Sequence, residues 1–220
     1  MSKSVTAGMY GKAVNKAGGL VWALWNGLNT QRAHNAQISN PRTAKQLQVR
    51  VHFSVVAKLA KAFRPALLMA MHSTAKAAVN TIYGLFIKLN YSIVSISAGG
   101  LVTVDFSNLL VTKGGCRKVN TSGGIDWGAT EHLKISVPIS SEGMTDENKD
   151  DEVYLVVYND ETKESVLSLA ATRSDENVSV ICPASFNGVV CHLYMFAISK
   201  EEQTMDMPSD SVYLGAAEVE

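Results

Sequence analysis

The residues best suited to catalysis in this 220-residue chain are five histidines and three cysteines, and they are widely scattered. The histidines lie at positions 34, 52, 72, 132 and 192. His52 and His72 can approach one another only across a pair of helices. Cys191 and His192 are adjacent, so on a strand they point to opposite faces and cannot act as a nucleophile and its base. We therefore interpret the histidines as structural and expect no catalytic residues.

Metal and phosphate sites have equally little support. The spacing of Cys116, Cys182 and Cys191 matches neither a zinc ribbon nor a redox pair, and we interpret all three as buried free thiols. The acidic stretch 145–152 lacks the ligand spacing and central glycine of a calcium loop, which favours a solvated loop over weak cation binding. The Gly-Gly pairs at 114–115 and 123–124 are interpreted as turns. The sequence thus predicts a protein that is not an enzyme and has no metal or cofactor.

The distribution of charge is the strongest functional signal. The chain has 20 Lys and Arg and 20 Asp and Glu, yet residues 1–104 contain 12 of the basic residues and none of the acidic ones. A basic half of this kind suits docking on a phosphate backbone. It equally suits head-to-tail assembly, in which the basic end of one subunit meets the acidic end of the next. A merely solvated basic surface is disfavoured, because soluble surfaces usually mix both signs.

No segment has the composition of a signal peptide or a membrane helix. The early lysines at 3, 12 and 16 are not followed by an apolar block, and the stretch 66–89 is interrupted by polar and charged residues. We expect an unprocessed protein that stays on the cytoplasmic side of the cell that makes it and has no membrane partner.

The first 63 residues predict an arm, a hairpin and a helix. Residues 1–19 are the arm, and Asn26-Gly27 between residues 20–25 and 28–33 is a strong hairpin signal. Either Asn40 followed by Pro41, or Thr43 with Gln46 as a capping box, begins a helix that runs to about Phe63. The apolar stripe expected on that helix is Leu47, Val51, Val55, Leu59 and Ala62.

A second helix and a set of strands are predicted to follow. The helix begins at Pro65, and its stripe is Leu68, Met71, Ala75, Ala78 or Val79, and Ile82. Strands are expected at 92–97, 101–106, 109–112, 133–138, 153–158, 165–172, 177–181, 189–198 and 212–219. The predicted fold class is α+β, with a two-helix unit and a C-terminal antiparallel β-sandwich of roughly seven to nine strands. The predicted domains are a basic region, 1–90, and an acidic sandwich, 91–220.

Three motifs resemble a known family. Residues 40–53 follow the pattern Asn-Pro-x-Thr-x-x-Gln-x-x-x-Arg-x-x-Phe, residues 11–14 are Gly-Lys-Ala-Val, and residues 209–215 are Ser-Asp-Ser-Val-Tyr-Leu-Gly. Together they resemble an uncharacterised family of Bacteroidota and their phages, known as a domain of unknown function, over most of the chain. The N-terminal part is also similar to small proteins of crAss-like gut phages, first described as integration-host-factor-like and associated with rings between portal and tail. The resemblance implies a structural role in a phage or prophage particle and supplies no catalytic residues.

These observations predict a virion protein, made in the bacterial cytoplasm and built into a neck or tail ring. Its predicted partners are other copies of itself and neighbouring virion proteins. The alternative is a DNA-binding nucleoid-like or regulatory protein. The residues predicted at the subunit interface are Trp22, Trp25, Asn40, Gln46 and Arg50. The residues predicted to contact nucleic acid or an acidic partner are Arg32, Arg42, Lys45, Lys58, Lys61 and Arg64. Gln46 and Arg50 lie four residues apart on one helix face and can instead make local hydrogen bonds that hold the hairpin to the helix.

Overall fold

The computed structural model of the chain describes residues 15–17, 20–25, 28–34, 42–78, 80–97, 99–128, 131–200 and 207–220. The chain divides into two compact units, Met1–Leu47 and Gln48–Glu220. The boundary between the units falls in the first turn of helix α1 (Ala44–Ala62). The change in the sign of charge, at Asp105, therefore lies inside the second unit.

The first unit contains a small antiparallel sheet. Its strands are β1 (Asn15–Ala17), β2 (Leu20–Trp25) and β3 (Leu28–Ala33), in that order across the sheet. The pairing of β2 with β3, from Leu20↔Ala33 to Trp25↔Leu28, confirms both predicted strands of the hairpin. The turn residues 26–27 lie outside the described residues, as does most of the predicted arm. Strand β1, within that arm, was not predicted.

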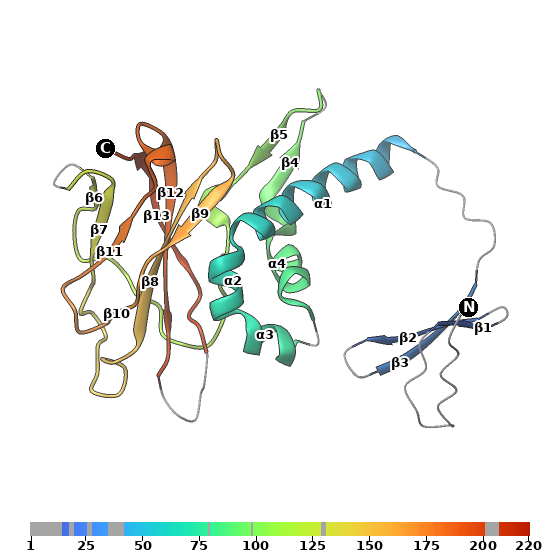
Figure 1. Ribbon diagram of the computed structural model, residues 1–220, viewed down its shortest axis with the longest axis horizontal. Coiled ribbons are helices and arrows are strands. Elements are labelled where there is room, and N and C mark those ends of the chain that lie inside the picture. Colours follow the sequence, from blue (N-terminus) through green and yellow to red (C-terminus); the bar gives the residue numbers. More distant parts are fainter. Residues whose placement is uncertain are drawn as a thin grey trace. The chain divides into compact units, whose positions relative to one another are not determined.

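Four helices open the second unit (Figure 1). They are α1, α2 (Arg64–Ala70), α3 (His72–Ala77) and α4 (Ile82–Asn90). The start of α1 is a capping box: the amide of Gln46 donates to Oγ1 of Thr43, the amide of Thr43 donates to Oε1 of Gln46, and both distances are 3.4 Å. Of the two predicted caps, the one at Thr43 lies within the described residues, and Asn40 lies outside them.

The prediction of one long second helix was wrong. The backbone leaves helical geometry at Met71 (φ −104°, ψ 2°), and Thr81 is fully extended before α4. Thr81 then caps α4, since its Oγ1 accepts from the amide of Gly84 at 3.0 Å. Because the axis changes direction at each break, the predicted stripe does not stay on one face. Met71 is buried, whereas Leu68 is half exposed.

Two antiparallel sheets and a hairpin form the rest of the second unit. The five-stranded sheet has the order β10 (Ala171–Thr172), β8 (Glu152–Asn159), β12 (Val190–Ile198) and β13 (Val212–Glu218), with β9 (Glu164–Leu167) also paired to β8. The three-stranded sheet has the order β11 (Asn177–Ile181), β7 (Lys134–Pro138) and β6 (Asp126–Trp127). The hairpin pairs β4 (Val94–Ile96) with β5 (Val102–Val104). Short 3-10 helices cover Tyr91–Ile93, Phe106–Asn108 and Ala184–Phe186.

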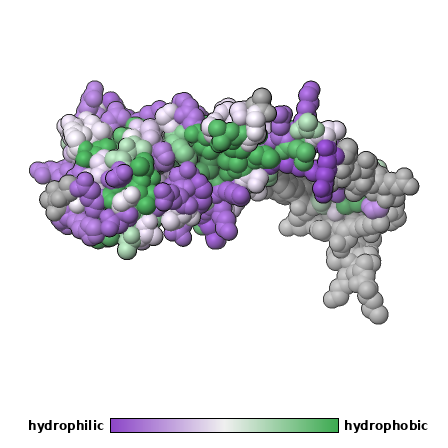
Figure 2. Space-filling model, turned by 90° about the horizontal axis from the view of Figure 1, so that it is seen from above, coloured by the Kyte–Doolittle hydropathy of each residue, from purple (hydrophilic) through white to green (hydrophobic). Residues whose placement is uncertain are grey.

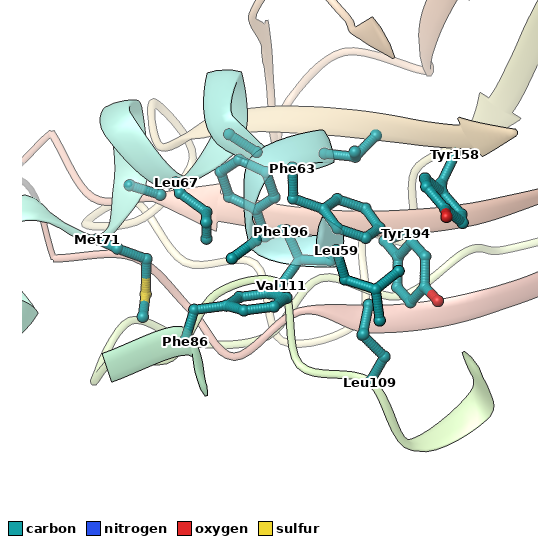
Figure 3. Close-up of a cluster of buried hydrophobic side chains, with 14 of the residues drawn as sticks. Leu59, Phe63, Leu67, Met71, Phe86, Leu109, Val111, Tyr158, Tyr194 and Phe196 are labelled. Atoms are coloured by element: carbon teal, nitrogen blue, oxygen red, sulfur yellow. The ribbon is translucent and has the colours of Figure 1, made fainter. Parts of the chain in front are cut away.

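The second unit has three layers, because the central five-stranded sheet is buried on both faces. The helices cover one face, where Phe63 and Leu67 pack with Phe86, Tyr194 and Phe196 (Figure 3). The three-stranded sheet covers the other face, and a second core lies between the two sheets (Figure 1). Members of that second core are Ile135, Val137, Leu155, Val178 and Leu193. The predicted α+β class is confirmed, and residues 153–158 are a continuous hydrophobic run because both of their faces are covered.

The predicted strand at 109–112 is extended chain without a strand partner. Several of its backbone groups are met by side chains instead, while the carbonyl of Thr112 accepts from the amide of Ser211 at 3.1 Å. Asn90, fully buried, donates to the carbonyl of Leu110 and accepts from its amide, both at 2.8 Å. Oγ of Ser211 accepts from the amides of Val111 at 2.9 Å and Thr112 at 3.3 Å. The strand prediction was therefore wrong for a definite reason, since side chains satisfy the polar backbone that a sheet would otherwise satisfy.

Candidate assembly surface

The N-terminal half of α1 is exposed, although it is rich in hydrophobic residues. Leu47, Val49, Val51 and Phe53 are between 42% and 56% exposed. The helix enters the core only from Val56 onward, where the central sheet faces it. The predicted stripe therefore packs into the core only over its second half, at Val55, Leu59 and Ala62. We call these four residues the α1 surface, and in Figure 2 hydrophobic surface runs along α1 and beside the β4–β5 hairpin.

Basic side chains accompany the α1 surface. Five of the basic residues that were predicted to contact a partner lie on or next to this helix and are exposed. They are Arg42, Lys45, Lys58, Lys61 and Arg64. Arg50 is also exposed on α1 and interacts with other groups of the chain. The side chain of Gln46 bonds to Thr43 in the capping box, and no hydrogen bond from it to the described residues of the hairpin is seen. Because no acidic residue precedes Asp105, the whole helix is positively charged.

The hairpin residues predicted at the interface are described only in part. Trp22 is half-buried in β2, whereas Trp25 lies in β2 with its side chain outside the described residues. Arg32 is exposed in β3. Each of these residues belongs to the first unit, as do Arg42, Lys45 and Gln46.

A pocket of about 310 Å³ adjoins the C-terminal half of α1. Apolar side chains from α1, β5 and the 3-10 helix at Phe106 line it, together with the charged Lys58, Asp160 and Lys163. Asp160 accepts from Nζ of Lys163 at 2.6 Å and from the hydroxyl of Tyr158 at 3.1 Å. Burial and the nearby Asp160 raise the pKa of Tyr158, so this phenol stays protonated and does not act as a base.

Two of the five histidines take part in packing contacts within the described residues. His52 stacks on Tyr91, with ring centroids 4.4 Å apart, and thereby holds α1 to the chain after α4, while His72 is exposed in α3. His192 stacks on Phe106 at 4.0 Å and lies 3.1 Å from the hydroxyl of Tyr213 through its Nδ1. Burial lowers the pKa of His192. Its neighbour Cys191 lies in the core between the sheets, which confirms that the two side chains point to opposite faces.

Sequence reasoning missed a buried ion pair. Nε of Arg173 donates to Oδ2 of Asp151 at 2.9 Å, and both side chains are at most 6% exposed. Asp151 belongs to the acidic stretch interpreted as solvated, so that interpretation was wrong for this residue. Cys116 is half-buried beside the pair. Cys182 and Cys191 are buried as predicted, and burial raises their pKa values to about 11 and about 12, which keeps both thiols protonated.

The fold and its surface define a three-layer α+β protein with an exposed helix that is both basic and apolar. Among the described residues, no three His, Cys, Asp or Glu side chains are grouped so that they could hold a metal ion. Within the same residues, no helix is long and apolar enough to cross a membrane. The chain belongs to a family of unknown function, DUF6266, which matches residues 9–215. No curated protein and no solved structure matches the chain.

Proposed function

We propose that this protein is a structural component of an assembly, and that its copies associate through their basic N-terminal part. The observation that carries the proposal is the α1 surface, where four hydrophobic side chains are exposed on a helix without acidic residues. An exposed apolar stretch of this kind is typical of an interaction site. A helix also gains most of its stability from packing, so a partner would stabilise the half of α1 that the core leaves uncovered.

Charge favours a protein partner with an acidic surface. Residues 105–220 of every copy carry all 20 acidic residues and only 8 basic ones, so one copy presents an acidic region to the basic helix of the next. Complementary charge would steer the two regions together, and burial of the α1 surface would hold them. The resemblance of the N-terminal motifs to ring proteins of crAss-like phages supports a place in a virion, in a ring at the neck or tail.

The test is the association of the purified chain, measured by light scattering at low and moderate salt. We expect the wild-type chain to form a defined oligomer, and a Val51→Ser/Phe53→Ser variant to be monomeric with an unchanged circular dichroism spectrum. The matched control is Leu68→Ser/Met69→Ser, which removes two exposed hydrophobic side chains from α2 and should leave the oligomer intact. A wild-type chain that is monomeric under all conditions overturns the proposal.

The second candidate function is DNA binding, which the exposed Arg42, Lys45, Lys58, Lys61 and Arg64 favour. Binding through several phosphate contacts weakens steeply with salt, by about 0.9 in log K per contact for each unit of log salt. An oligomer held by apolar burial persists as salt rises. A monomer that shifts DNA in a gel, and loses the shift at moderate salt, would support this second function instead.

A further inference from the structure

Strand β11 is an open edge of the three-stranded sheet. Among the described strands it pairs only with β7, and only every second residue of β11 forms backbone hydrogen bonds with β7. The carbonyl of Glu176 accepts from Ile139 at 2.9 Å, and the amide of Cys182 donates to Leu133 at 2.8 Å. By the alternation of an antiparallel ladder, the backbone groups of the odd-numbered residues 177, 179 and 181 point away from β7. Pro138, opposite Asn177, agrees with this register because it has no N–H to donate.

A groove of about 600 Å³ follows this free edge. All five residues of β11 line it, and the connection from Leu167 to Ala171 lines its other side. Within the described residues, no hydrogen bond is recorded for the outward backbone groups of Asn177, Ser179 and Ile181. Leu169 and Ile181 are 88% and 73% exposed, more than any other large hydrophobic residue in the described chain. The groove therefore combines unpaired backbone with uncovered apolar side chains.

Natural sheets usually protect an edge strand with proline, an inward charge or a covering segment. Strand β11 reads Asn-Val-Ser-Val-Ile, with none of these, and its burial alternates regularly between exposed and buried residues. Such an edge is suited to receive an added strand, whose main chain supplies hydrogen bonds and whose side chains cover the exposed hydrophobic residues.

The first unit offers a suitable donor. Among the described residues, its strand β3 pairs only with β2 and therefore lies at an edge of the described sheet, and residues 29–33 are all exposed. None of the described side chains in this three-stranded sheet is buried. A sheet this small needs a covered hydrophobic face or further strands to be stable. The first unit thus needs a partner that the described part of the sheet does not itself supply.

The charges near β3 and near β11 favour the same pairing of these two strands. The first unit has no acidic residue, and Arg32 is exposed on β3. The groove has Asp175 in its lining, and the exposed Glu176 comes directly before β11. The basic residue in the lining, Lys134, is already neutralised by Glu131 at 2.9 Å. The donor strand thus carries a basic residue, whereas acidic residues lie next to the β11 edge.

We propose that the β3 edge of one copy adds to the β11 edge of a second copy. This inference rests on the proposed function, since it names the surface that accepts the basic N-terminal part. Repeated from copy to copy, the contact is head-to-tail, so it gives a ring when the rotation closes.

The first experiment changes the charge at one exposed position of the acceptor. Ile181→Lys places a positive charge against the basic donor and should weaken association at least tenfold, measured by analytical ultracentrifugation. Ile181→Glu, the matched control of opposite sign, removes the same apolar side chain and should associate more tightly than Ile181→Lys. Both variants should unfold at the wild-type temperature, because residue 181 is exposed. Equal association of the two variants overturns the proposal.

The second experiment locates the donor. Gln31→Cys and Ser179→Cys are made in separate chains, mixed and treated with a short bismaleimide. Both variants also carry Cys116→Ser, because Cys116 is only half-buried, whereas Cys182 and Cys191 are buried. We expect a cross-linked dimer from the mixture and little from either variant alone or from the Cys116→Ser chain. An oligomer that forms but gives no specific cross-link overturns strand addition while leaving the proposed function intact. A chain that never associates overturns the proposed function itself.

Discussion

Arg173 and Asp151 together hold four segments of the second unit in place. Besides its 2.9 Å bond to Asp151, Arg173 donates to the backbone carbonyls of Arg117 and Lys118. Asp151 in turn accepts from the amide of Lys200 at 3.4 Å. A buried charge is tolerated where it is paired and hydrogen-bonded, and here almost every polar atom of the pair has a partner. The pair therefore fixes where the loop after Gly115 and the end of β12 meet.

Removal of one member of this pair should be severe. Arg173→Met leaves the Asp151 carboxylate buried without its cation, and we expect the free energy of unfolding to fall by about 3–5 kcal/mol. Urea denaturation followed by tryptophan fluorescence measures the change. Lys163→Met is the control, because it breaks an exposed ion pair with Asp160 and should cost no more than about 1 kcal/mol. Similar losses in the two variants would contradict the structural role given to the buried pair.

At the scale of elements, the segment 109–114 is held by residues near the end of the chain. Ser211 accepts from two of its amides, Ser209 accepts from Thr112 through its carbonyl at 2.8 Å, and Asp210 accepts from Gly114 at 3.2 Å. A Cβ atom on Gly114 would lie 2.1 Å from the carbonyl oxygen of Pro208, so this close approach requires glycine. The Ser-Asp-Ser motif that carried part of the family resemblance is thus a clamp between distant segments.

The clamp predicts a local effect that can be measured. Ser211→Ala leaves the buried amides of Val111 and Thr112 without an acceptor, so we expect a loss of about 1–3 kcal/mol in the free energy of unfolding. Hydrogen exchange should become faster at these two amides in particular. Thr103→Ala, which removes an exposed hydroxyl paired with Ser95, is the control and should leave exchange at 111 and 112 unchanged. Uniformly faster exchange across the central sheet would argue against a local clamp.

The same elements explain how far the sequence predicts the structure. Strands whose pattern is local, such as β7, β8, β11 and β12, lie where periodicity placed them. The segment 109–112 was misjudged because its hydrogen-bond partners include Ser211, about a hundred residues away. On α1, periodicity shows which residues share a face, but not how much of that face a sheet covers. The spacing therefore could not show that Val51 and Phe53 are exposed, whereas the composition did show that the residues around them are basic.

At the scale of the whole molecule, the two units differ in what stabilises them. The buried residues of the two cores all lie at or after Val56 in the chain. They therefore all belong to the second unit. The second unit therefore has its own cores, three layers and buried ion pair. None of the described side chains in the sheet of the first unit is buried, and among the described residues its outer strands, β1 and β3, each have one strand partner. This asymmetry is what a subunit needs if one part is a rigid body and the other is completed by a neighbour.

A chain that lacks residues 1–41 tests this division. The deletion removes four basic residues and no acidic ones, so the remainder, with 16 basic and 20 acidic residues, has a net charge of −4. Because both cores and the capping box at Thr43 are retained, we expect the unfolding temperature to stay within about 2 °C of the full chain, no more than the shift that about 1 kcal/mol produces in a domain of this size. Association should be weakened, since the donor strand is gone while the acceptor edge and the α1 surface remain. Addition of the shortened chain to the full chain should then limit the growth of the oligomer, because the shortened chain accepts a β3 strand at β11 and offers none. Light scattering of the mixture measures this, and unchanged assembly would show that the N-terminal part is not the donor.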